Sequence, residues 1–163
     1  MIGSIGKIIT SLFGKKSDKD VKFILPLVKE ILAEQEKIKD ISNDELRKNS
    51  DIFRKEIKDF IKSEEDKIEQ LKADAEKVGL PVLEKEALFK EVDQLTKTID
   101  EKIEEVLNKI LPRAFANIRE TSKRFKDNQE ISVVATEMDK ELAARKENIE
   151  IDGDQAIYST TWD

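Results

Sequence analysis

The sequence predicts a mainly α-helical protein made of long antiparallel helices, with a small β-hairpin near its carboxyl end. Charged residues make up 40% of its 163 residues, and it has five glycines and three prolines, which favours long solvated helices over a strand-rich core. Apolar residues recur at three- and four-residue steps over most of the chain, the spacing that gives a helix one apolar face. This length suits one compact domain, or one domain with an extended helical projection.

The first fourteen residues predict a basic amphipathic helix. Six apolar residues fall within an arc of about 140° when each residue turns the helix by about 100°. They are Ile2, Ile5, Ile8, Ile9, Leu12 and Phe13. The first 22 residues hold five lysines and two aspartates, so they carry +3 while the rest of the chain carries −9. This asymmetry favours contact with an anionic lipid surface or an acidic partner, and the alternative is a helix docked on the body of the protein.

The next two helices each have a recognisable start. Phe23 opens a second apolar stripe, and Pro26 is tolerated best in the first turn of a helix, so we expect a start near Phe23. Ser42 and Glu45 have the spacing of a capping box, and Ile41 is placed to begin a hydrophobic staple. The capping box is therefore a strong local signal for a helix that begins just after Ser42.

A helical hairpin is predicted for residues 63–111. Ser63 is placed to cap its first helix, and Gly79 with Pro81 supplies a stop and a turn. The returning helix carries a coiled-coil seam of apolar residues at steps of four and three. Its members are Leu88, Val92, Leu95, Ile99, Ile103, Val106 and Ile110. The seam predicts either packing within the chain or a homodimer interface, and the sequence leaves both open.

The last third of the chain mixes helix and strand. Pro112 predicts a kink or a restart, followed by a narrow apolar stripe of Ala114, Phe115, Ile118 and Phe125. The basic residues that flank this stripe are expected to be solvated: Arg113, Arg119, Lys123 and Arg124. We expect residues 126–136 to form a loop or a short strand around residues 131–135. A brief helix that Thr136 and Asp139 start is then expected to run to Lys146. Alternating residues around Asp152 and Gly153 predict a hairpin with a tight turn.

The composition excludes several kinds of chemistry. The chain has no histidine and no cysteine, so it lacks the usual neutral-pH base, the commonest nitrogen ligand and any thiolate. No stretch has the spacing of a phosphate-binding loop, no broad basic surface suits a nucleic acid, and no run approaches the roughly 20 apolar residues that span a bilayer. We therefore predict no catalytic, cofactor-binding or metal-binding residue in this chain, and no nucleic-acid partner.

Two blocks of the sequence resemble the amino-terminal region of the SecA family of preprotein translocase ATPases. They are ISNDELRKNSDIFRKEI (residues 41–57) and ILPRAFANIRETSKR (residues 110–124), and they stand in the order of that family. The opening MIGSIGKIITSLFGKKSDKD (residues 1–20) is also similar to the start of that family. Residues 58–109 and 125–163 depart from the pattern, because many members join these blocks closely and continue soon afterwards into the nucleotide-binding fold.

The resemblance implies an ATP-driven motor that pushes preproteins through the SecYEG channel. ATP and Mg²⁺ would be cofactors of the intact parent and would bind beyond Asp163, so this segment alone should be inactive. The expected partners are the channel, preproteins and an anionic phospholipid surface, with a homodimer possible. The expected location is the cytoplasm, peripherally associated with the inner membrane. The membrane- or channel-contacting residues would be Ile2, Ile5, Lys7, Ile8, Ile9, Leu12, Phe13, Lys15 and Lys16.

These expectations divide the chain into five segments. They are an amphipathic helix with a basic linker (1–20), amino-terminal motor helices (21–62), an inserted helical hairpin (63–111), a motor helix (112–125), and an insertion with a short helix and a β-hairpin (126–163) that leads into the nucleotide-binding fold. The alternative to a motor segment is an independent helical adaptor that acts at a membrane surface or through a coiled coil.

Overall fold

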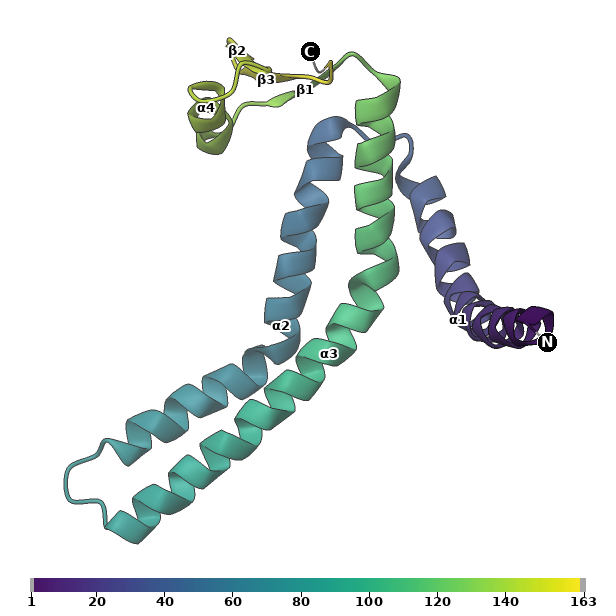
Figure 1. The fold of residues 1–163 in the computed structure, drawn as a ribbon. Helices are drawn as coiled ribbons and strands as arrows, with labels where there is room; N and C mark the ends of the chain where they lie inside the picture. Colours follow the sequence, from purple (N-terminus) through teal and green to yellow (C-terminus); the bar gives the residue numbers. More distant parts are fainter. Residues whose placement is uncertain (1, 162–163) are drawn as a thin grey trace.

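The computed structural model describes the backbone of residues 2–161 and the side chains of residues 19–161. Its elements are α1 (Ile2–Ile38), α2 (Asn43–Ala75), α3 (Val82–Asp127), β1 (Glu130–Val134), α4 (Glu137–Ala143), β2 (Ile149–Asp152) and β3 (Gln155–Ser159). Figure 1 shows a long hairpin of α2 and α3, with α1 beside one end of α3 and the small sheet beyond that same end. The predicted fold class, mainly helical with a small strand-containing unit near the carboxyl end, is confirmed.

The α2–α3 hairpin begins and turns where local sequence signals place its ends. The Ser42 hydroxyl accepts the backbone N–H of Glu45 at 3.2 Å, and the Glu45 carboxylate accepts the backbone N–H of Ser42 at 2.8 Å. This is the predicted capping box, which satisfies two amides that the first turn of a helix leaves free. At the far end Gly79 adopts a φ of 85°, a left-handed conformation that glycine reaches without the steric cost of a Cβ.

The apolar seam of α3 packs within the chain. Val92, Val106 and Ile110 are buried, and the remaining members of the seam are partly covered. Their partners come from α2, which runs antiparallel alongside α3 and buries Ile61 and Leu71. The seam is therefore occupied by α2, so the packing alternative holds and this seam is not available for a homodimer.

Two predicted helix starts are wrong, because α1 already includes Phe23 and Pro26 and α2 continues past Ser63. At Pro112 the predicted restart is wrong because α3 continues through it, which leaves the alternative of a kink. A proline removes one backbone hydrogen bond, and a long helix that packs on a neighbour tolerates this loss with a bend. Both helices of the hairpin change direction part-way along their length (Figure 1). The boundaries at 20, 62, 111 and 125 all fall inside continuous helices, and the division into five segments stays a prediction.

The last third forms a unit of one short helix and a three-stranded antiparallel sheet of order β1-β3-β2. Thr136 caps α4 with Asp139 as predicted, although α4 ends at Ala143 and not at Lys146. β2 and β3 pair Asp152 with Gln155 across a two-residue turn, in which Gly153 has a φ of 60°. Of the loop and the strand expected around residues 131–135, the strand is correct, and the predicted hairpin is confirmed. β3 lies in the centre of the sheet because it pairs with both β1 and β2.

α1 reaches the hairpin only with its carboxyl-terminal part. It contacts α3, whereas its amino-terminal half leans away from the hairpin (Figure 1). Phe23, on the part that leaves α3, exposes 86% of its surface. Within the described residues, no helix is long and apolar enough to cross a bilayer.

Candidate functional site

The two sequence blocks, residues 41–57 and 110–124, lie side by side at one end of the hairpin. We call this region the junction, because the end of α1, the start of α2, the end of α3 and the sheet meet there (Figure 1). Asn49 donates to the side-chain oxygen of the buried Asn117 at 2.9 Å. Arg113 forms a two-pronged ion pair with Glu56, with one N–O distance of 2.8 Å. The residues that carry the family resemblance therefore pair with one another across α2 and α3.

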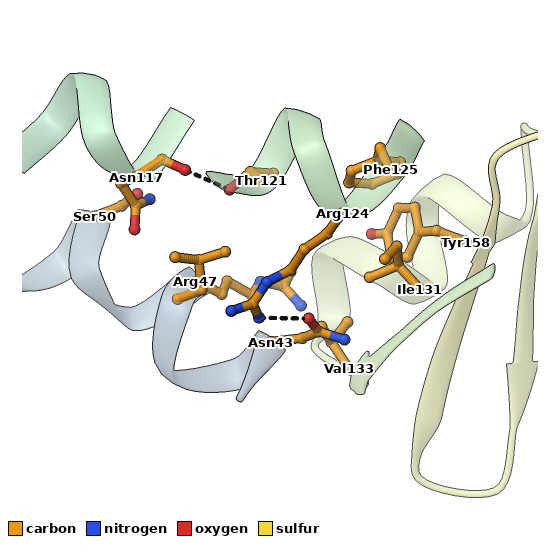
Figure 2. Close-up of a pocket in the computed structure, with 11 residues that line it drawn as sticks. Asn43, Arg47, Ser50, Asn117, Thr121, Arg124, Phe125, Ile131, Val133 and Tyr158 are labelled. Carbon is orange, nitrogen blue, oxygen red and sulfur yellow. Dashed lines mark hydrogen bonds between the residues drawn. The ribbon is translucent and has the colours of Figure 1, made fainter. Parts of the chain in front are cut away.

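Arg124 ties three elements together at the junction. Its side chain is 14% exposed and forms an ion pair of 3.0 Å with Glu120, which is 4% exposed. It also donates to the Asn43 side chain at 2.8 Å, a bond drawn in Figure 2, and to the backbone carbonyl of Lys39 at 3.2 Å. One guanidinium thus fixes the loop between α1 and α2 against α3.

Glu120 joins α1 to the same network. Its second carboxylate oxygen accepts a hydrogen bond of 3.0 Å from Gln35 of α1, and Arg119 donates to the Gln35 side-chain oxygen at 2.7 Å. Burial opposes the charge on Glu120, but the hydrogen bonds from Gln35 and Arg124 hold its pKa below the ordinary value. Among the described residues, no buried side-chain nitrogen or oxygen lacks a hydrogen-bond partner.

Asp139 links the sheet unit to α2. Its carboxylate is fully buried and receives both terminal nitrogens of Arg47 at 2.8 Å. The backbone N–H of Thr136 donates to it at 2.7 Å, and the hydroxyl of Tyr158 on β3 donates to its other oxygen. A buried charge is tolerated when it is paired and fully hydrogen-bonded, and this carboxylate meets both conditions.

These contacts shift the pKa of Asp139 in a definite direction. The Arg47 hydrogen bonds lower the pKa of Asp139 far below its usual range, with Tyr158 and Thr136 acting in the same sense and burial opposing them. A lowered folded-state pKa means that this group stabilises the fold above about pH 4, the ordinary value of the unfolded chain. That contribution is lost as the pH falls through and below this value.

Tyr158 provides a direct optical test of this network, because it is the one tyrosine in the sequence. Burial, followed by its bond to Asp139, raises the pKa of Tyr158 to about 12. We expect the ultraviolet absorbance of tyrosinate to rise with a midpoint near pH 12 in the folded chain, against about 10 in strong denaturant. The stabilisation by the neutral phenol is present below about pH 10 and lost between 10 and 12. A folded-state midpoint near 10 would contradict the network.

A cleft of about 290 Å³ opens beside the junction, between α2, α3 and the sheet. Figure 2 shows its lining, with Phe125 of α3 and the sheet residues Ile131, Val133 and Tyr158 near one another and Arg124 reaching to Asn43. Among the described residues, no group of three or more carboxylates is placed to hold a metal ion. Most of the exposed lining of the cleft is apolar, which suits packing of a hydrophobic group, although polar side chains such as Asn43, Arg47 and Ser50 also line it.

The predicted membrane- or channel-contacting residues stand apart from the junction. Residues 2 to 16 belong to the helical backbone of α1, but their side chains lie outside the described residues. The junction uses the opposite end of α1, at Gln35 and Ile38. The structure therefore does not bring these predicted residues and the junction together, and their contacts stay a prediction.

Sequence reasoning missed the polar core of the junction. The expectation that the basic flank of α3 is solvated is wrong for Arg124, whose side chain is largely buried against the buried Glu120. Arg113 keeps 37% of its side-chain surface exposed, although it pairs with Glu56. The expectation is correct for Lys123, which is exposed, whereas the exposed Arg119 still bonds to α1. The sequence places Asp139 in a helix cap, but its partner Arg47 lies 92 residues away in the chain, and no local pattern connects the two.

Comparison with known proteins gives one consistent family. A family model described as "SecA DEAD-like domain" matches residues 9–136. The Protein translocase subunit SecA of Parabacteroides distasonis is 40% identical over 156 residues, which cover 96% of this chain and 14% of that protein. The proteins of the same name from Amoebophilus asiaticus and Flavobacterium psychrophilum are 40% and 39% identical over 161 and 158 residues, covering 96% and 97% of this chain and 14% of each.

The alignment covers nearly all of this chain but only a small part of each relative. Nearly the whole of this chain aligns, whereas it spans about 14% of the length of the curated relatives that it matches. No solved structure matches this chain significantly. The comparisons therefore concern one segment of a much longer type of protein.

Proposed function

Because this chain belongs to the SecA family, we propose that it forms the amino-terminal segment of an ATP-driven motor that moves preproteins through the SecYEG channel. Within that motor, the segment would serve in docking and in regulation of the parent, and it would not itself hydrolyse ATP. The observation that carries the proposal is the junction. The two family-like blocks hold helices together, because Arg113, Asn117 and Arg124 of the second block bond to side chains of the first block, which are Glu56, Asn49 and Asn43.

The polar core of the junction supports a docking role. Its ion pairs and hydrogen bonds connect α1, α2, α3 and the sheet unit, so movement of any one element would be transmitted to the others. ATP and Mg²⁺ would be bound elsewhere in the parent, because these 163 residues contain no G-x-x-x-x-G-K-[ST] sequence to cradle phosphates.

ATP binding tests this division of labour. We expect titration calorimetry of the isolated chain with MgATP to give no heat of binding, while the intact parent binds under the same conditions. The physical reason is that the sequence lacks the glycine-rich loop whose backbone N–H groups and lysine together hold a phosphate. Tight binding of ATP by the isolated chain would contradict the proposal.

Membrane association is a second part of the proposed role, supported by the charge and spacing of residues 1–16. Six apolar side chains and three lysines on this stretch suit the surface of an anionic bilayer, which would place the parent in the cytoplasm at the inner membrane. The helical backbone of α1 and the way its amino-terminal half leaves the hairpin are compatible with such a contact (Figure 1).

Removal of residues 1–16 is expected to abolish most co-sedimentation of the chain with anionic liposomes. Neutral liposomes serve as the control, because the lysines would then lose their attraction to the surface. Equal sedimentation with and without these residues would remove the membrane role. The alternative, an independent adaptor at a membrane surface, would be favoured by a different pair of results. These are strong liposome binding and the finding that the gene encodes no longer protein that contains this chain.

A further inference from the structure

α3 exposes a row of large apolar side chains on a face that neither α1 nor α2 covers. Leu107, Phe115, Ile118 and Phe125 are 46%, 50%, 62% and 38% exposed. Together with Leu111 they fall within an arc of about 80° at 100° per residue, and we call these five residues the α3 stripe. Between residues 107 and 125, Ser122 is the one further residue whose position on the helix falls within this arc. The arc therefore contains no charged residue.

The α3 stripe continues into the apolar cleft of the junction. Phe125 belongs to both, since it lines the cleft together with Leu46, Ile131 and Val133. Figure 2 shows Phe125 beside Ile131 and Tyr158, at the end of α3 that faces the sheet. The two features therefore form one hydrophobic surface that runs along the last part of α3 and ends between α2 and the sheet. Contiguous exposed apolar surface of this kind marks a site of interaction.

We propose that this surface is the docking site for the part of the parent chain that follows residue 163. The inference deepens the proposed function, because it rests on this chain being one segment of a longer motor. It gives the junction a specific role, in which α3 and the cleft hold the segment against the remainder of the same polypeptide.

The position of the last described residues supports this occupant. The Thr160 backbone N–H donates to the carbonyl of Gln129 at 2.9 Å, and its hydroxyl donates to the carbonyl of Asn128 at 2.6 Å. Both partners directly follow α3, so a chain that continues from Thr160 starts close to the Phe125 end of the stripe. The relatives supply the length, because this chain corresponds to about 14% of each of them.

The exposed area of the stripe argues against a second copy of this chain as the occupant. The four exposed side chains present roughly 400 Å² in total, about half of the roughly 800 Å² that each partner buries in a standard interface. A second copy would therefore find too little surface for a stable dimer.

Cysteine labelling can test the proposal, because the chain has no cysteine of its own. Ile118→Cys places a thiol on the stripe, and Val78→Cys places a control thiol at the hairpin tip, where Val78 is fully exposed. The rate of alkylation by N-ethylmaleimide is measured by peptide-level mass spectrometry in the isolated chain and in the intact parent. We expect Ile118→Cys to react at least about tenfold more slowly in the parent and Val78→Cys to react at similar rates in both.

Each other outcome overturns the proposal. Equal rates for Ile118→Cys in the two proteins would show that the stripe stays uncovered, and Phe115→Cys repeats this test one turn away. Slower labelling of the isolated chain as its concentration rises would identify a second copy as the occupant. Protection that needs anionic vesicles would identify lipid. Failure here would leave the motor assignment intact, whereas ATP binding by the isolated chain would defeat that assignment without changing the labelling rates.

Discussion

Replacing Asp139 with asparagine is expected to lower the free energy that holds the sheet unit on α2 by about 3 kcal/mol, because breaking a buried ion pair leaves its partner uncompensated. The carboxylate accepts from Arg47, Thr136 and Tyr158 at once. An asparagine keeps the shape but offers one acceptor oxygen in place of two and removes the charge that balances the guanidinium. Hydrogen exchange of the β3 amides measures the loss, since these amides exchange when the sheet unit opens.

Asp51→Asn is the matched control for Asp139→Asn. Asp51 also pairs with an arginine, Arg54, at 2.8 Å, but both side chains are more than 70% exposed. An exposed pair of this kind contributes about 0.5 kcal/mol or less, so β3 exchange should stay close to that of the unmodified chain. If Asp139→Asn and Asp51→Asn changed the exchange of β3 equally little, the Arg47 contact would not be holding the sheet unit in place.

The elements that the sequence predicts correctly are those specified by residues three or four positions apart. The capping boxes at Ser42 and Thr136 and the turn at Gly153 are complete within four residues, and each has a backbone reason to form. The α3 seam is likewise a local repeat, although its partner helix had to be read from the structure. These signals fix where helices and strands begin, and they suffice for the fold class.

The helices of the hairpin continue past local start signals for one physical reason. Ser63 and Pro112 carry the local preference of a helix start, but each lies inside a helix that the packing of α2 against α3 extends past it. Propensity differences of about 1 to 3 kcal/mol are smaller than what a long packed face supplies. A sequence reading that weighs residues only against their neighbours therefore divides these helices too often.

The candidate site was only half predictable for a different reason. Blocks 41–57 and 110–124 identify the family, but their function in the fold comes from pairs such as Asn49 with Asn117, 68 residues apart. Charged residues on a helix are usually exposed to solvent. Arg113 and Arg124 have the same kind of sequence surroundings as Arg54, whose side chain is exposed. The meeting of α1, α2 and α3 buries Arg124, whereas Arg113 links α3 to α2 from a partly exposed position.

Arg124→Met is the variant expected to loosen α1 from the hairpin most, with a loss of about 3 kcal/mol, because it leaves the Glu120 carboxylate buried with Gln35 as its remaining side-chain partner. The methionine keeps the apolar stem of the arginine, so the loss reports the charge and its hydrogen bonds. We expect faster hydrogen exchange in residues 27–38 of α1 and a lower midpoint of urea unfolding. The exposed pair provides the control, since Arg54→Met should change neither measurement by more than about 0.5 kcal/mol.

A second substitution separates an ion pair from simple packing. Replacing Glu120 as well, in the double variant Arg124→Met with Glu120→Met, removes the stranded carboxylate and should recover most of the stability lost in Arg124→Met, because apolar side chains of similar volume replace buried ion pairs at little cost. Recovery would show that the single variant fails through an unpaired buried charge. If the double variant were as unstable as the sum of both single variants, Arg124 and Glu120 would act independently, and the junction would owe its stability to the backbone contacts of Arg124 with the loop between α1 and α2.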